Sequence, residues 1–199
     1  MRIVIIGSSW LASELLLNCV QNHFEICAII APNLEDRLAI TGFENDIAVH
    51  TFACLDSVCS ELKPDVILAA HCHAFISATA RGFARLGCFA YHPSLLPRHR
   101  GRDAIEWAIR FGEKVTGGTL YQMDDGVDTG AIALQDWCFI RPRDDARSLW
   151  QRELGPMGIR LFEKLLFMIK GGLAIPSVAQ DETVATREPA LKQPRLAAS

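Results

Sequence analysis

A histidine and an aspartate, each in a loop-forming stretch, are the two residues of this sequence best suited to chemistry. His92 is followed at once by Pro93, and Asp128 lies in a loop bracketed by Gly126 and Gly130. An imidazole beside a carboxylate can accept or release a proton near neutral pH. The two residues therefore predict acid–base catalysis, with a structural histidine and an ordinary turn aspartate as the alternatives.

The elements that must position this pair are predicted by runs of apolar residues. Continuous runs predict strands at Arg2–Ile6, Ile26–Ala31, Ile47–Phe52, Val66–Ala70 and Gly87–Tyr91. Helices are predicted between them at Leu11–Val20, Leu55–Leu62 and Ile76–Leu86. Strands that are apolar throughout and alternate with helices indicate a parallel sheet covered on both faces. His92 then comes at the carboxyl edge of that sheet, where open α/β sheets bind ligands.

The C-terminal half is expected to differ from this pattern. After a predicted helix at Arg102–Phe111, two runs at Gly118–Met123 and Ala131–Ile140 predict an antiparallel pair with a long connection. A helix over Ser148–Ile169, which Gly155-Pro156 should break or kink, completes a domain of residues 1–172. The polar tail, 173–199, is expected to pack on the surface or to fray. The predicted fold class is an open α/β sheet, mostly parallel with one antiparallel pair.

The composition argues against several functional classes. The chain has 199 residues, enough for one domain, with 50% hydrophobic and 22% charged residues. A net charge of −3 argues against a nucleic-acid-binding surface. Seven cysteines, an odd number without a CxxC motif, indicate a reduced, cytoplasmic protein rather than a disulfide scaffold. The N-terminus lacks the layout of a signal peptide, and no apolar run is long enough for a membrane span.

Three further clusters are candidates for binding. Gly7-Ser8-Ser9 is either a tight structural turn or a contact with a substrate, since the GxGxxG fingerprint of a dinucleotide site is absent. His71-Cys72-His73 could offer two metal ligands, but no spacing supplies the others. We therefore expect these residues to line a pocket and expect no metal. A basic cluster could hold an anion or could be solvated; it comprises Arg98, His99, Arg100 and Arg102.

Two motifs give the sequence a resemblance to a known family. They are His-Pro-Ser-Leu-Leu-Pro at 92–97 and Asp-Gly-Val-Asp-Thr-Gly at 125–130. Over roughly residues 1–170 the chain resembles the formyltransferases that use 10-formyltetrahydrofolate. These include glycinamide ribonucleotide, methionyl-tRNA and nucleotide-sugar formyltransferases and the hydrolase domain of formyltetrahydrofolate dehydrogenase. The resemblance implies a Rossmann-like formyltransferase fold and 10-formyltetrahydrofolate as co-substrate.

The resemblance also implies which residues form the site. The family combines an Asn-x-His motif with a distant Asp, so His92 and Asp128 are implied as catalytic, and Ala90 departs from the Asn. A folate pocket is implied at His73, Ala74, Phe75, Ile76, Met123, Asp124, Asp125, Gly126 and Val127. Acceptor contacts are expected at Ser8, Ser9, Trp10, His99 and Arg100. The peptide bond before Pro97 is expected to be cis, as it often is in relatives.

The implied reaction is transfer of the formyl group to the amine of a small molecule, such as a sugar or amino acid, through a tetrahedral intermediate. Ala90 leaves two alternatives open. Segment 91–101 is most similar to the hydrolase domain, which also has an apolar residue at the Asn position, and this implies hydrolysis to formate. The second alternative is a non-catalytic folate-binding protein, against which the retention of His92 and Asp128 speaks. A tRNA acceptor is not expected, because the charge is acidic and the family's C-terminal tRNA-enzyme barrel does not follow; the oligomeric state stays open.

Overall fold

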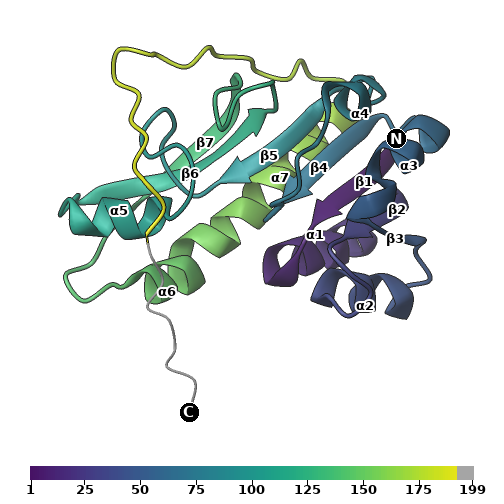
Figure 1. Cartoon of the computed structure of the whole chain (residues 1–199), viewed down its shortest axis with the longest axis horizontal. Helices are drawn as coiled ribbons and strands as arrows, with labels where there is room; N and C mark the ends of the chain where they lie inside the picture. Colours follow the sequence, from purple (N-terminus) through teal and green to yellow (C-terminus); the bar gives the residue numbers. More distant parts are fainter. Residues whose placement is uncertain (192–199) are drawn as a thin grey trace.

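A seven-stranded sheet forms the centre of the computed structural model, which describes residues 1–191 (Figure 1). The strands follow the order β3-β2-β1-β4-β5-β6-β7 across the sheet. Their bounds are Arg2–Gly7 (β1), Glu25–Ala31 (β2), Val49–Thr51 (β3), Val66–Ala70 (β4), Cys88–His92 (β5), Val115–Gln122 (β6) and Ile132–Phe139 (β7). β1 to β5 are parallel, whereas β6 is antiparallel to both β5 and β7. The predicted fold class is therefore confirmed.

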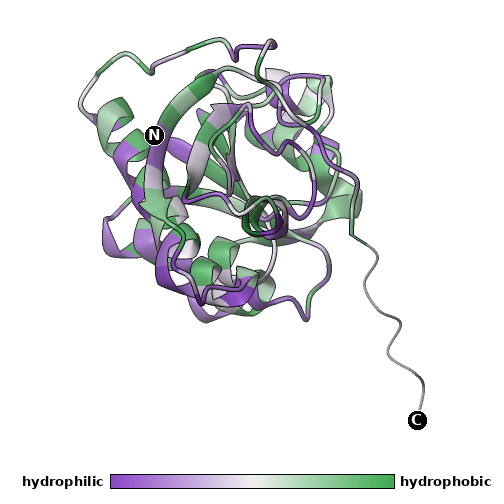
Figure 2. Cartoon of the chain, turned by 90° about the vertical axis from the view of Figure 1, so that its left-hand side faces the viewer, coloured by the Kyte–Doolittle hydropathy of each residue, from purple (hydrophilic) through white to green (hydrophobic). Residues whose placement is uncertain are grey.

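Helices pack on both faces of the sheet. α1 (Ser9–Gln21) and α7 (Gly155–Lys170) bury their apolar residues on one face, and α3 (Leu55–Leu62) and α4 (Ala78–Gly82) cover the other. Each fully buried Leu or Phe contributes about 1.5–3 kcal/mol relative to an exposed one. Figure 2 shows hydrophobic residues concentrated in the strands and in stretches of the helices. Within residues 1–191, no helix has the length and hydropathy that crossing a membrane requires.

The chain reverses its direction of travel across the sheet between β1 and β4. From β1 it runs outward through β2 to β3, and it then returns to place β4 on the other side of β1. The carboxyl ends of β1 and β4 therefore open into a crevice, which is where sheets of this kind bind ligands. Gly7 ends β1 and Ala70 ends β4, so the Ser8–Ser9 turn and the His71–His73 segment meet there.

Several elements differ in extent from the sequence prediction. α2 (Arg37–Glu44) was not predicted. The helix predicted at Ile76–Leu86 is limited to α4, and the Ser77 hydroxyl caps its start by accepting a hydrogen bond from the backbone N–H of Ala80 (3.0 Å). α5 covers Ala104–Arg110 only. The remaining short elements are the 3₁₀ turn Phe52–Cys54 and α6 (Ala146–Leu149).

The predicted break at Gly155-Pro156 takes the form of a wider helical turn. Residues Trp150–Leu154 form a π-helical turn that joins α6 directly to α7. Pro156 has no backbone N–H, so the regular helical hydrogen bond cannot form at that position. A π turn accommodates the mismatch without interrupting the helix.

One carboxylate caps two helices near the crevice. Asp36 accepts from the backbone N–H of Leu38 at the start of α2 (2.8 Å) and from that of Ser9 at the start of α1 (3.1 and 3.2 Å). The positive ends of both helix dipoles therefore face the same negative charge. The cap adds to the burial of Leu38 and Ala39, which pack α2 against the core.

The described part of the C-terminal tail runs in extended form across the antiparallel half of the sheet (Figure 1). It forms bridges between Val178 and Ile132 and between Arg187 and Arg100. Thr186 donates to the carbonyl of Pro97 (3.0 Å) and accepts from the N–H of Arg100 (2.9 Å). The predicted tail thus packs on the surface over 173–191, whereas residues 192–199 lie outside the described part of the chain.

An ion pair fastens this tail to the loop that follows β5. The guanidinium of Arg100, only 7% exposed, donates to both carboxylate oxygens of Glu182 (2.9 and 2.6 Å). These hydrogen bonds hold the pKa of Glu182 below its ordinary value. The pair is therefore intact at neutral pH and is lost as the pH falls below about 4.3, through the lowered pKa of the folded state.

Asp36→Ala should destabilise the fold by about 2 kcal/mol, because it removes the cap of two helices at once. Urea denaturation followed by circular dichroism would measure the loss. Glu35→Ala, which removes an exposed neighbouring carboxylate, should leave the midpoint unchanged. Equal midpoints for Asp36→Ala and the unmodified protein would show that the double cap contributes nothing.

Glu182→Gln should release the tail at neutral pH, because the amide cannot replace the charged pair with Arg100. Hydrogen exchange at Arg100 and Thr186, measured by NMR or mass spectrometry, is expected to be several-fold faster. Asp181→Asn removes the adjacent charge, which contacts only Thr183 among the described residues, and should keep the native protection. Unchanged exchange in Glu182→Gln would mean that the backbone bonds alone hold the tail.

Candidate active site

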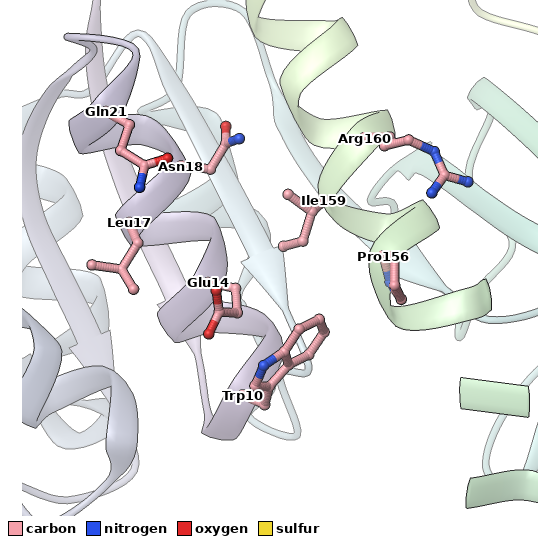
Figure 3. A pocket seen from close by; sticks show the side chains of 8 residues that line it. All are labelled: Trp10, Glu14, Leu17, Asn18, Gln21, Pro156, Ile159 and Arg160. Atoms are coloured by element: carbon pink, nitrogen blue, oxygen red, sulfur yellow. The ribbon is translucent and has the colours of Figure 1, made fainter. Parts of the chain in front are cut away.

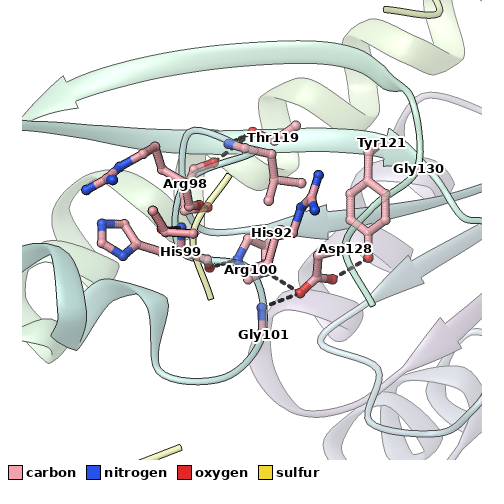
Figure 4. Close-up of polar contacts among 12 residues, drawn as sticks. His92, Arg98, His99, Arg100, Gly101, Thr119, Tyr121, Asp128 and Gly130 are labelled. Carbon is pink, nitrogen blue, oxygen red and sulfur yellow. Dashed lines mark hydrogen bonds and ion pairs between the residues drawn. The ribbon is translucent and has the colours of Figure 1, made fainter. Parts of the chain in front are cut away.

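His92 is the last residue of β5 and lies buried at the carboxyl edge of the sheet. Its Nε2 is 2.7 Å from the carbonyl oxygen of His99, and its Nδ1 is 3.6 Å from Oδ2 of Asp128 (Figure 4). A carbonyl oxygen can only accept, so Nε2 carries a hydrogen. Both ring nitrogens face acceptors, and only the doubly protonated ring can donate to both. The arrangement therefore suits an imidazole that carries positive charge during a reaction.

Asp128 is fixed by donors on either side of its carboxylate. Oδ2 accepts from the backbone N–H of Gly101 (2.7 Å), and Oδ1 accepts from the hydroxyl of Tyr121 (2.6 Å) (Figure 4). Its backbone is left-handed, with φ 57°, an uncommon state for a non-glycine residue. The structure thus brings the two predicted catalytic residues together; their catalytic role stays a prediction.

The side chain of His99 does not face the crevice. It is 2% exposed, with Nε2 3.1 Å from Glu113 and Nδ1 3.1 Å from Glu188, the latter without hydrogen-bond geometry. Its left-handed backbone (φ 57°) turns its carbonyl toward His92. Arg100 is likewise engaged within the chain, by Glu182 and Gln180. An acceptor substrate could bind the His99 or Arg100 side chain only by replacing these contacts within the chain.

The other predicted acceptor residues surround the start of α1. The Ser8 hydroxyl donates to the carbonyl of His71 (2.8 Å), and the N–H of Ser9 is already bound by Asp36. The turn is therefore not an open anion site. Trp10 packs edge-on against Trp150, with 6.3 Å between ring centroids. It also stands at one end of a groove of about 310 Å³ between α1 and α7, which Glu14 and Ile159 line from the two helices (Figure 3).

The two predicted folate segments are joined by a residue that the sequence did not single out. Arg81 donates to the carbonyl of Ile76 (2.6 Å) and forms an ion pair with Asp125. Two large apolar side chains beside it are open to solvent: Phe75 is 79% exposed and Val127 is 51% exposed. Ile76, by contrast, is buried in the core. Exposed apolar groups on two converging loops are what the rings of a flat ligand could cover.

His71 and His73 form an edge-on pair with 4.7 Å between ring centroids at the end of β4. Burial and the neighbouring His73 lower the pKa of His71, which favours its neutral form. Among the described residues, no group of three or more His, Cys, Asp or Glu side chains is arranged to hold a metal. The peptide bond between Leu96 and Pro97 is cis, as expected from the resemblance.

Two polar contacts of the site were missed by sequence reasoning. Tyr121 lies within a predicted strand, where nothing distinguishes it from a core aromatic. Gln180 lies in the tail, and its amide donates to the carbonyls of Asp128 (2.9 Å) and Gly130 (2.8 Å). Alternation along β6 places Tyr121 on the same face as Thr119, the residue paired with His92. This shared face is the one signal that could have indicated Tyr121 as part of the site.

Comparison with known proteins supports the resemblance. A family model described as formyl transferase matches residues 50–156. Cytosolic 10-formyltetrahydrofolate dehydrogenase from Xenopus laevis is 36% identical over 97% of this chain but only 23% of its own length. Methionyl-tRNA formyltransferase from Syntrophus aciditrophicus is 35% identical over 68% of the chain and 43% of its own. The chain thus spans less than a quarter of the dehydrogenases it matches.

Solved structures share the fold at low sequence identity. Glycinamide ribonucleotide transformylase 1 from Symbiobacterium toebii has a TM-score of 0.80 at 18% identity, covering 90% of this chain and 93% of that one. An N-formyltransferase from Helicobacter canadensis has a TM-score of 0.79 at 23% identity, covering 94% and 70%. The family match covers more than half of the sequence and includes both His92 and Asp128. The chain therefore belongs to the formyl transferase family.

Proposed function

We propose that this chain transfers a formyl group from 10-formyltetrahydrofolate to the amine of a small molecule. The observation that carries the proposal is the meeting of His92 and Asp128 at the carboxyl edge of the sheet, 3.6 Å apart and fixed by surrounding donors. A positioned imidazole with a carboxylate partner is suited to proton transfer and to stabilising negative charge. The exposed Phe75 and Val127, one in each of the two segments proposed to hold the folate, offer apolar surface for the pterin ring.

Relatives of the same fold support folate as the donor. The Helicobacter canadensis N-formyltransferase was crystallised with folinic acid and dTDP-3-aminofucose. HypX from Aquifex aeolicus, at a TM-score of 0.75 and 19% identity, was crystallised with tetrahydrofolic acid. The segments proposed to hold the folate here are 73–76 and 123–127, which Arg81 ties together.

The proposed mechanism assigns each step to a group of this chain. The bound donor presents a formyl group on its N10 atom. Attack by the acceptor amine forms a carbon–nitrogen bond and moves the carbonyl electron pair onto oxygen, where an N–H of protonated His92 stabilises it. When the carbonyl re-forms and the bond to N10 breaks, His92 gives its proton to the leaving nitrogen and takes the proton that the attacking amine nitrogen loses. For this the Nε2 hydrogen must be shared with, or released from, the His99 carbonyl.

Hydrolysis is the second candidate, and two observations favour it. Several matching relatives are 10-formyltetrahydrofolate dehydrogenases, at 31–42% identity. Ala90 also supplies no side-chain donor at a position where formyltransferases carry Asn. In this alternative water takes the place of the amine and formate is released. Folate release that depends on an amine, tested with amino sugars and amino acids, supports transfer; equal release without any amine supports hydrolysis.

His92→Asn and Asp128→Asn should each lower consumption of 10-formyltetrahydrofolate by about 10²–10⁴-fold, because proton transfer and charge stabilisation are lost. Consumption is followed by absorbance. His23→Asn makes the same exchange at an exposed histidine and should keep the native rate. Rates within twofold of the unmodified protein for either site variant would reject the proposed roles.

Ala90→Asn should raise the rate of formyl transfer about tenfold or more if a missing donor limits the reaction, since one such donor is typically worth more than this. The side chain at 90 shares the His92 face of β5. Ala90→Leu adds a side chain of similar shape without a donor and should not accelerate. A fall in rate for both variants would show instead that Ala90 provides space that the reaction uses.

A further inference from the structure

The hydroxyl of Tyr121 lies against the catalytic carboxylate from the side opposite His92. It donates to Oδ1 of Asp128 at 2.6 Å, while Oδ2 faces His92 and accepts from Gly101. Figure 4 shows the phenol reaching Asp128 from β6, with the Gly101 loop on the far side of the carboxylate. The two oxygens of Asp128 are thus held by different donors. A carboxylate held at only one oxygen could rotate about the Cβ–Cγ bond.

Tyr121 is also the direct cross-strand partner of Ala90. The two residues face each other in the antiparallel pairing of β5 with β6 and pack in the same apolar cluster. Directly opposed residues have Cβ atoms only about 4.5–5.5 Å apart. A methyl group at 90 therefore leaves room for the phenol ring.

The phenol is suited to act as a donor and not as an acid. Burial and the charge of Asp128 raise the pKa of Tyr121 well above its usual value, so the hydroxyl keeps its proton at neutral pH. Asp128 is the hydrogen-bond partner of this hydroxyl among the described residues. A buried donor that served packing alone would not need to meet a carboxylate.

We propose that Tyr121 is the positioning residue of the His92–Asp128 pair, holding the carboxylate in line with the imidazole. It acts through Asp128 and does not contact the formyl group. Its kinetic consequence rests on the proposed function, whereas its effect on the imidazole does not.

The test is Tyr121→Phe, which keeps the ring and removes the hydroxyl. With 10-formyltetrahydrofolate as substrate, kcat should fall about tenfold, the value expected for one hydrogen bond, and KM should stay the same. The acidic limb of the pH–rate profile should move to higher pH, because a donor that favoured the ionised carboxylate is gone. Without folate, the midpoint of the His92 imidazole titration, followed by NMR, should fall, because a carboxylate that is free to turn away stabilises the imidazolium less.

Tyr91→Phe is the matched control. Tyr91 is the other of the two tyrosines in the sequence and points to the opposite face of the sheet. Its buried hydroxyl donates to the carbonyl of Leu154 (2.7 Å). Both variants lose one buried hydrogen bond, but Tyr91→Phe should leave the pH–rate profile and the His92 midpoint unchanged. A purely structural role for Tyr121 predicts that the two variants behave alike.

The outcomes separate the two proposals. An unchanged His92 midpoint in Tyr121→Phe, whatever the rate, overturns the positioning role. A shifted midpoint in a protein that never consumes 10-formyltetrahydrofolate upholds the positioning role and rejects the proposed function. A shifted midpoint together with the lower kcat and the displaced acidic limb supports both.

Discussion

The position of one carboxylate governs the arrangement of the site. Asp128 accepts hydrogen bonds from a backbone N–H in the loop after β5 and from a hydroxyl of β6, and it lies 3.6 Å from the imidazole that ends β5. Each donor comes from a different segment. The position of the carboxylate therefore depends on the register of the sheet and on the path of two loops. A shift of either loop would break a charge-assisted bond and misalign the pair, which explains why so many further contacts restrain these loops.

Those restraints extend beyond the sheet to the tail. The Gln180 amide binds the carbonyls of Asp128 and Gly130, and the backbone of Thr186 pairs with the loop that carries His99. The left-handed backbone of His99 and Asp128 carries a local conformational cost, which the surrounding hydrogen bonds offset. The tail therefore belongs to the architecture of the site, although its sequence carries no motif.

The sequence predicted the sheet and pointed to His92 and Asp128, which the fold brings together, because apolar strands and the two loop motifs are local signals. It missed α2, a short helix whose start is capped by Asp36, the carboxylate that also binds the start of α1. It also assigned His99 to the acceptor, whereas the side chain is buried between two glutamates and only the carbonyl faces His92. Tyr121 and Gln180 escaped notice because their roles arise from cross-strand register and tail path, which no local pattern encodes.

The central claim is that His92 and Asp128 act as one unit on 10-formyltetrahydrofolate. A double-mutant cycle measures this most directly, with the rate of folate consumption determined for the unmodified protein, His92→Asn, Asp128→Asn and the double variant. Groups that act as a unit are strongly non-additive, so the double variant should be about as slow as the slower single variant. Losses that multiply independently, or an unmodified protein that consumes no folate substrate, would contradict the account.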